Sequence, residues 1–183
     1  MVTIAEIKET ITLPEDVTAT IEKGMVTITG EKGSLSRMFA HPKISISLKD
    51  NTLMISCKNA RRKQKALVGT FIAHLNNMIK GVTQGFEYKM KTVYSHFPIK
   101  TLVEGNTFII ENFLGERSPR KAVILDGVTV EVKGDDVTAT GIDKEKVGQT
   151  VANIERATAV KRRDIRVFQD GVYRTSKGGD IAQ

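Results

Sequence analysis

The chain has 183 residues, of which 40% are hydrophobic and 5% aromatic, which is enough for two compact domains with cores of Val, Ile, Leu and Met. Its single cysteine, Cys57, excludes an intramolecular disulfide framework and a cysteine-rich zinc site. The net charge of +7 and a pI near 9.5 favour a polyanionic partner, either nucleic acid or an acidic membrane surface, although a basic soluble protein would carry the same charge.

The amino-terminal segment, MVTIAEIKETITLPEDV, predicts a protein without a targeting signal. It alternates polar and apolar residues, and it lacks the basic start and apolar core of a signal peptide. No stretch of the sequence approaches the roughly 18 uncharged apolar residues that a membrane span requires. We therefore expect a soluble, unprocessed, cytoplasmic protein.

Period-two alternation predicts short strands through most of the first half of the chain. The expected strands cover residues 4–13, 17–22, 25–30, 43–49 and 52–57. Asp50 and Asn51 form a tight turn that joins the last two strands into a hairpin. The GEKGS segment at residues 30–34 lacks the spacing of a phosphate-binding loop and does not lead into a helix, so it indicates a hairpin turn.

The hydrophobic period then changes to that of a helix. Apolar residues recur four apart at Leu67, Phe71, Leu75 and Ile79, which predicts an amphipathic helix that ends near Gly81. From residue 86 to residue 101 the pattern is again that of an extended chain.

The second half of the chain repeats the order of the first. The alternating residues Ile44, Ile46 and Leu48 correspond to Val128, Val130 and Val132. The segment GTFIAHL at residues 69–75 likewise matches GQTVANI at residues 148–154. We therefore predict an α+β protein of two tandem copies, at residues 1–94 and 95–183, of a small antiparallel sheet with one helix packed on a face.

The first copy has five more residues between its hairpin and its helix than the second copy. These residues lie in the segment KNARRKQK, around Arg61, Arg62, Lys63 and Lys65. We expect a basic loop there, because loops commonly carry the variable binding surface of a fold. Contact with RNA is no more favoured for this loop than contact with protein or plain exposure to solvent.

No set of reactive groups in the sequence predicts an enzyme, a metal site or a cofactor site. His41 is expected at the surface, and His74 lies within the first helix. His96 lies beside aromatic residues, where packing or hydrogen bonding is its expected role. Cys57 corresponds to Gly141 in the second copy, so a thiol is not required there and a small buried residue is expected.

The basic residues cluster in the second half, although residues 1–91 have a net charge of +6 and residues 92–183 only +1. Seven cations lie between residues 156 and 177, against Asp164 and Asp170: Arg156, Lys161, Arg162, Arg163, Arg166, Arg174 and Lys177. The DIRVF segment predicts a strand with Ile165 and Val167 on one face and Arg166 on the other. A solvated strand edge is the alternative explanation of this charge, but we favour RNA contacts.

Four blocks of the sequence resemble a known family, protein six of the large ribosomal subunit, in its archaeal and eukaryotic form (counterpart number nine in eukaryotes). They are VTITGEKGSLSR at residues 26–37, NMIKGVTQGFEYKMKTVYSHFPI at 77–99, NFLGERSPRKA at 112–122 and DIRVFQDGVYRTSKG at 164–178. The chain lacks the PEPYKGKG type of tail that is typical of bacterial members, and its short ending favours the archaeal branch.

The resemblance implies a structural, rRNA-binding constituent of the large subunit, near the stalk base and the sarcin-ricin loop, where translational GTPases dock. Neighbouring ribosomal proteins would be further partners, and the second domain would make most RNA contacts. The family blocks assign an RNA-facing role to Arg117, Arg120, Lys121, Arg166, Arg174 and Lys177. Clustering alone assigns it to Arg156, Lys161, Arg162, Arg163 and Tyr173. The alternative class is a protein-interaction module in which RNA is secondary.

Overall fold

The computed structural model describes residues 4–179 of the chain, with the side chains of residues 6–58 and 60–176. These residues divide into two compact units, the first ending at Gln84 and the second beginning at Gly85. Each unit has a hydrophobic core of its own.

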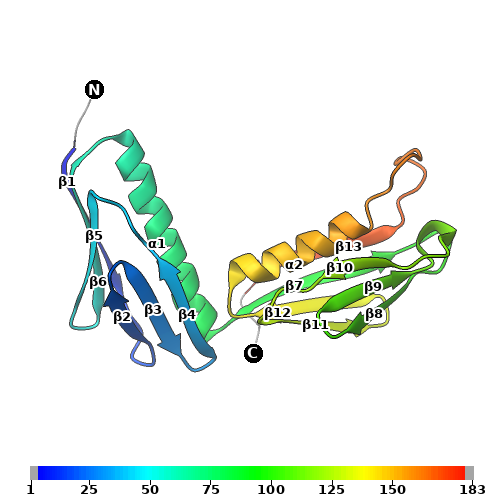
Figure 1. Cartoon of the computed structure of the whole chain (residues 1–183), viewed down its shortest axis with the longest axis horizontal. Coiled ribbons are helices and arrows are strands. Elements are labelled where there is room, and N and C mark those ends of the chain that lie inside the picture. The colour runs from blue at the N-terminus through cyan, green and yellow to red at the C-terminus, as the bar shows by residue number, and fades with distance from the viewer. Residues whose placement is uncertain (1–3, 180–183) are drawn as a thin grey trace. The chain divides into compact units, whose positions relative to one another are not determined.

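The first unit consists of two antiparallel three-stranded sheets and one long helix, α1 (Arg62–Thr83), which packs against both sheets (Figure 1). The first sheet has the order β1-β6-β5, with β1 (Ile4–Thr12), β5 (Ile44–Lys49) and β6 (Thr52–Ala60). The second sheet follows the chain order, with β2 (Thr18–Glu22), β3 (Met25–Gly30) and β4 (Gly33–Met38).

Alternation along the strands and the apolar stripe of α1 form the core of this unit. Val26 and Ile28 of β3 are fully buried, as is Leu75 of α1. The sheet approaches the last turn of α1 so closely that a Cβ atom at Gly30 would lie 2.9 Å from the carbonyl oxygen of Val82. Only glycine allows this contact without a shift of the backbone.

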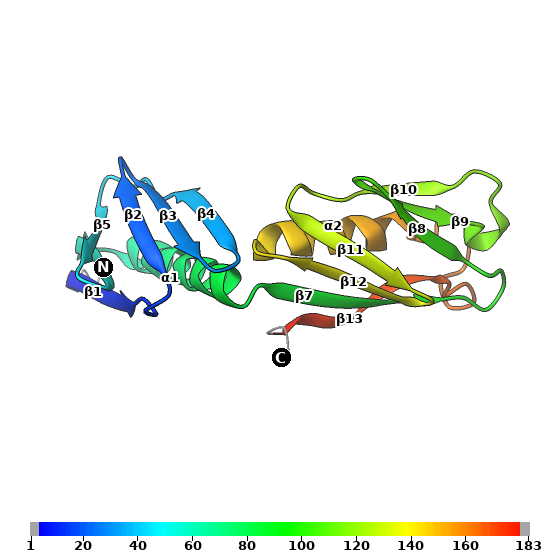
Figure 2. The same cartoon turned by 90° about the horizontal axis from the view of Figure 1, so that it is seen from below.

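The second unit consists of a four-stranded antiparallel sheet, a three-stranded antiparallel sheet and the helix α2 (Lys144–Ala157) (Figures 1 and 2). The larger sheet has the order β11-β12-β7-β13, with β7 (Phe86–Val93), β11 (Val128–Lys133), β12 (Asp136–Gly141) and β13 (Gly171–Gly179). The smaller sheet has the order β10-β9-β8, with β8 (Lys100–Glu104), β9 (Thr107–Glu111) and β10 (Arg120–Val123).

The strand registers of the two units match residue by residue. Ile44, Ile46 and Leu48 pair with Cys57, Ile55 and Leu53, just as Val128, Val130 and Val132 pair with Gly141, Ala139 and Val137. The predicted α+β class, the tandem duplication and the equivalence of Cys57 with Gly141 are therefore confirmed. Each copy contains two sheets, one more than we predicted.

The boundary between the units precedes the predicted one, which lay between residues 94 and 95. β7 pairs with β12 in the second unit as β1 pairs with β6 in the first. β7 is therefore the first strand of the second copy, and the chain passes from one unit to the other at Gln84 and Gly85.

The additional residues of the first copy extend its strand and helix instead of forming a basic loop, so that prediction was wrong. α1 has 22 residues against 14 in α2, and only Arg61 separates it from β6. β1 continues the pairing with β6 as far as Ala60. The side chain of Gln64 then accepts a hydrogen bond from the backbone N–H of Arg61 at 3.2 Å, which starts the helix at once.

Two further features of the described residues bear on function. No helix within residues 4–179 is long and apolar enough to cross a membrane. In the same part of the chain, no three His, Cys, Asp or Glu side chains lie together in a group that could hold a metal ion. Cys57 is buried in the core of the first unit, as predicted.

Candidate nucleic-acid interface

The basic segments of the second unit meet at the carboxyl-terminal end of α2. β10 reaches this end through Arg120, whose Nη1 atom donates hydrogen bonds to the carbonyl oxygens of Ala157 (2.9 Å) and Ala159 (3.1 Å). β13 reaches it through the backbone N–H of Val172, which donates to Oγ1 of Thr158 at 3.1 Å. The loop that follows α2 and the loop between β9 and β10 consequently lie at the same end of the unit (Figures 1 and 2).

Arg120 is engaged within the protein, although we expected it to face RNA. Its Nε and Nη2 atoms donate to the two carboxylate oxygens of Glu116 at 2.8 and 2.6 Å, and its guanidinium lies 4.2 Å from the ring centre of Phe113. The hydrogen bond from Arg120 holds the pKa of Glu116 below its ordinary value. Arg120 therefore joins the loop before β10 to the end of α2.

Lys121 and Arg156 line one groove between β10 and α2, together with Val123 and Asn153. The groove has a volume of about 300 Å³. The side-chain amide of Asn153 donates to the carbonyl oxygen of Val123 at 3.0 Å and fixes the spacing between strand and helix. Both cations are exposed, so two predicted residues that are distant in the sequence share one surface.

The DIRVF segment is a turn, and the predicted strand was wrong. The carboxylate of Asp164 accepts hydrogen bonds from the backbone N–H of Arg166 at 2.9 Å and from its guanidinium at 2.9 and 3.1 Å. These bonds hold the pKa of Asp164 below its ordinary value. The turn leaves Ile165 and Val167 69% and 59% exposed, whereas the strand would have buried them.

The loop after α2 is held in place by a buried carboxylate, that of Asp170. It accepts hydrogen bonds from the backbone N–H and hydroxyl of Ser95 (2.5 and 3.2 Å) and from Nδ1 of His96 (2.8 Å). Burial would raise the pKa of Asp170, but these hydrogen bonds outweigh it and hold the pKa below its ordinary value. The ring of His96 stacks on Phe168 at 4.6 Å, which confirms a packing and hydrogen-bonding role for His96.

The remaining predicted cations of this loop differ in how they are held. Lys161 and Arg162 are exposed, and Arg162 has a left-handed backbone with a φ of 60°. The guanidinium of Arg163 lies over the ring of Phe168 at 4.8 Å. Arg117 is exposed in the loop before β10. Arg163 is thus partly engaged by the protein, whereas the other three are available to a partner.

β13 brings the last predicted residues to the same end of the unit. Tyr173 is half-exposed and donates its hydroxyl to the carbonyl oxygen of Gln169 at 3.0 Å. The backbone N–H of Arg174 donates to Glu155 of α2 at 3.0 Å, while the Arg174 side chain is exposed. The side chain of Lys177 lies outside the described residues.

Comparison with known proteins finds one family whose model matches both copies of the repeat. The family model of ribosomal protein L6 matches the chain twice, over residues 13–85 and 97–171, once in each unit. This chain belongs to the ribosomal protein L6 family. The resemblance that the four sequence blocks indicated is therefore confirmed.

Relatives in the ribosomal protein L6 family match this chain over nearly its whole length. The protein named large ribosomal subunit protein uL6 in Methanosphaera stadtmanae is 54% identical over 97% of this chain and 97% of its own length. Proteins of the same name in Methanobrevibacter smithii and Methanosarcina mazei are 50% and 47% identical, over 97% and 95% of this chain and 99% of each relative. All three relatives are archaeal, which confirms the archaeal type.

Sequence reasoning missed the partners through which the loop after α2 is held in place. Asp170, Ser95 and His96 join segments 74 and 75 residues apart, a separation that no local pattern reveals. The sequence did contain a signal that Arg120 bonds within the protein, because Glu116 lies four residues before it and could form an ion pair with it. The predicted residues of the first unit, Arg62, Lys63 and Lys65, begin α1 and are exposed.

Proposed function

We propose that this protein is a structural, non-catalytic constituent of the large ribosomal subunit whose second unit binds large-subunit rRNA. Membership of the ribosomal protein L6 family supports the place of the protein in the ribosome. The observation that carries the RNA-binding surface is the meeting of exposed cations from three elements at the end of α2. We call these cations the second basic surface, after the unit that carries them; they are Arg117, Lys121, Arg156, Lys161, Arg162 and Arg174.

The second basic surface suits the backbone of folded RNA. Folded RNA is recognised mainly through its shape and through phosphate and 2′-hydroxyl contacts, for which arginine forks are suited. The turn at Asp164, the Arg120 bonds and the Asp170 bonds hold the cations on fixed backbone, so little conformational entropy is lost on binding. Tyr173, Arg163 and Arg166 lie beside this surface and add a partly exposed ring and further positive charge.

The finer location follows from the family resemblance alone. The proposed surface lies near the stalk base and the sarcin-ricin loop, with neighbouring ribosomal proteins beside it and translational GTPases close by on the assembled ribosome. Lys177 would extend the same surface along β13.

The test is a salt titration of binding between the full chain and large-subunit rRNA. Replacing Arg156, Arg162 and Arg174 together by Gln should weaken binding. It should also make the negative slope of log K against log salt concentration shallower by about 2 to 3, because each lost phosphate contact contributes about 0.7 to 0.9 to the magnitude of that slope.

The matched control removes three exposed lysines outside the second basic surface, by Lys100→Gln, Lys133→Gln and Lys146→Gln. It changes the net charge by the same amount, so its slope should stay that of the parent. Equal slopes for the two triple variants would contradict the proposed surface, and absence of salt-dependent binding in the parent would contradict rRNA binding itself.

A further inference from the structure

The first unit contains a long segment without any acidic residue. Between residues 51 and 86 there is no Asp or Glu, against six cations: Lys58, Arg61, Arg62, Lys63, Lys65 and Lys80. The segment includes all of α1, a helix of 22 residues. Most surface helices carry both signs of charge, which keeps a domain soluble without a strong local field. A segment whose charged side chains are all positive favours a negatively charged partner.

Five of these cations gather with Lys43 at one end of the unit. β6 ends at Ala60, two residues after Lys58, and Arg61 alone separates it from α1, which begins at Arg62. Lys43 immediately precedes Ile44, which pairs with Cys57, so Lys43 lies at the same end of the sheet as Lys58.

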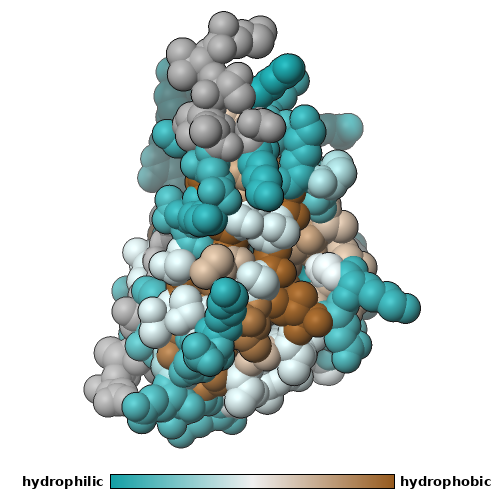
Figure 3. Space-filling view, turned by 90° about the vertical axis from the view of Figure 1, so that its left-hand side faces the viewer, coloured by the Kyte–Doolittle hydropathy of each residue, from teal (hydrophilic) through white to brown (hydrophobic). Residues whose placement is uncertain are grey.

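The first basic surface therefore combines the start of β5, the end of β6 and the first turn of α1. Hydrophilic side chains predominate in the upper part of the face shown in Figure 3, toward the end of the unit at which α1 begins in Figure 1. We define the first basic surface as Lys43, Lys58, Arg61, Arg62, Lys63 and Lys65, all of which are exposed.

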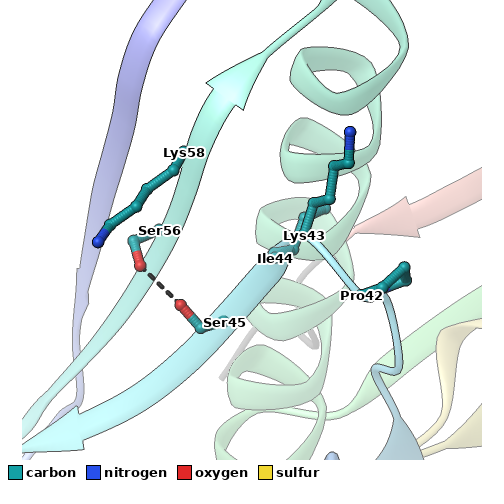
Figure 4. A pocket seen from close by; sticks show the side chains of 6 residues that line it. All are labelled: Pro42, Lys43, Ile44, Ser45, Ser56 and Lys58. Carbon is teal, nitrogen blue, oxygen red and sulfur yellow. Dashed lines mark hydrogen bonds between the residues drawn. The ribbon is translucent and has the colours of Figure 1, made fainter.

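Lys43 and Lys58 flank a depression of about 420 Å³ whose lining includes Ser45 and Ser56. The hydroxyl groups of the two serines are hydrogen-bonded to each other at 2.8 Å, and the two lysine side chains point away from each other (Figure 4). Ammonium groups that diverge in this way suit separate phosphates along an extended polyanion better than one small anion held between them.

The cations at the start of α1 oppose the folding of the helix. The amino-terminal end of a helix carries a partial positive charge, which acidic side chains stabilise and cations destabilise. The first turn of α1 contains no acidic residue, and it contains Arg62 and Lys63. Among the side chains that the structure describes, neither residue has an ion-pair partner. These charges lower the stability of the unit, which favours a role for them in binding.

The surroundings of the first basic surface favour RNA over protein. Protein interfaces depend on buried aromatic and aliphatic anchors, and they are depleted in lysine. The exposed large hydrophobic residues among the described side chains include none in α1 or in the segment from Lys43 to Ile46. The exposed residues that follow the cations on α1 are small, such as Ala66, Gly69 and Ala73. Among the described side chains, these small residues leave room beside the cations for a sugar-phosphate backbone.

We propose that the first basic surface binds the phosphodiester backbone of a folded RNA, so that the first unit forms a second RNA contact of the chain. The proposal rests on the proposed function in one respect, namely that this RNA is large-subunit rRNA. It assigns to Arg61, Arg62, Lys63 and Lys65 the RNA contact that the sequence left open between RNA and protein.

The test compares salt titrations of rRNA binding by the full chain and by the double variant Arg62→Gln, Lys63→Gln. The variant should bind roughly tenfold more weakly than the parent near about 100 mM salt. Its negative slope of log K against log salt concentration should be shallower than that of the parent by about 1.5. Its melting temperature should equal or exceed that of the parent, because the substitutions remove cations from a helix amino terminus.

The matched control is Lys23→Gln, Lys49→Gln, which removes two exposed lysines elsewhere on the first unit. Its slope should stay that of the parent. An unchanged slope in the Arg62, Lys63 variant would overturn the proposal. If the triple variant of the second basic surface still loses affinity in that case, the proposed function stands and only the first-unit contact fails.

A photoreactive side chain at Ala66 separates RNA from protein in assembled large subunits. Ala66 is exposed on α1 beside Lys65, so a crosslinker there reaches whatever covers the first basic surface. Crosslinks to rRNA would support the proposal. Crosslinks to protein alone, or no crosslink at all, would overturn it.

Discussion

The two units carry their cations at opposite ends of equivalent helices. In the first unit, Arg62 and Lys63 lie in the first turn of α1, where the helix dipole opposes them. In the second unit, Arg156 lies in the last turn of α2, where the dipole favours a cation, and Arg120 donates to carbonyl oxygens at and beyond the end of that turn. The duplicated fold therefore allows a basic surface at either end of its helix.

This difference changes how binding and stability are related. In the second unit some basic residues help to fold the unit, since Arg120 makes hydrogen bonds to Glu116, Ala157 and Ala159. In the first unit, Arg62 and Lys63 have no such bonds among the described side chains. We therefore expect mutations of basic residues to destabilise the second unit more than the first.

The largest effect is expected for Arg120→Ala. The substitution leaves the carbonyl oxygens of Ala157 and Ala159 without a donor and Glu116 without its partner, which should lower the free energy of unfolding by about 2 to 3 kcal/mol. Urea unfolding of the full chain measures this change. The neighbouring exposed Arg117→Ala should change stability by less than about 0.5 kcal/mol. Equal effects of the two substitutions would contradict the structural role of Arg120.

Asp170→Asn should lower the free energy of unfolding by about 2 kcal/mol at neutral pH, because hydrogen bonds to a carboxylate are stronger than those to an amide. The pKa of Asp170 is lowered in the folded protein, so its stabilisation is full above the unfolded pKa of about 4 and is lost as the pH falls through the folded value. Urea unfolding between about pH 3 and 7 should show the parent and the variant converging in acid. A difference independent of pH would refute the role of the carboxylate.

Gly30→Ala and Gly141→Ala should each lower the free energy of unfolding by about 1 to 3 kcal/mol, because a Cβ would lie 2.8 to 2.9 Å from Val82 and from Val147. A Cβ added at Gly69 would meet nothing within 4 Å, so Gly69→Ala should raise stability by about 0.5 to 1 kcal/mol. Thermal unfolding distinguishes the two signs. Destabilisation by Gly69→Ala would show that α1 is packed differently.

The sequence was sufficient for the repeated architecture, because strand alternation and the helical stripe recur in both units at matching registers. It was insufficient where short segments have two interpretations. Five alternating residues predicted a strand at DIRVF, but the side chain of Asp164 bonds the backbone two residues later and closes a turn. The start of α1 was missed because Arg61 is not a usual capping residue.

The sequence was sufficient to predict a cluster of basic residues, but not to predict which of its arginines are exposed and which bond to other parts of the protein. Arg117 and Arg120 lie three residues apart in one basic segment and look alike in the sequence. In the structure Arg117 is exposed, whereas Arg120 bonds residues 37 and 39 positions away. Such partners depend on tertiary packing, so only the folded chain separates an arginine that is exposed from one that holds the fold.

The smallest expected effect tests the comparison of the two helices most directly. Arg62→Glu places an acid at the start of α1 and should raise the free energy of unfolding by about 0.5 to 1 kcal/mol, whereas Arg156→Glu places an acid at the end of α2 and should lower it by a similar amount. Both substitutions change the net charge equally, so thermal unfolding at low salt isolates the position of the charge. The two shifts should shrink together in high salt, because exposed charges are screened. Shifts of the same sign would show that the helix dipole does not set the balance between the two surfaces.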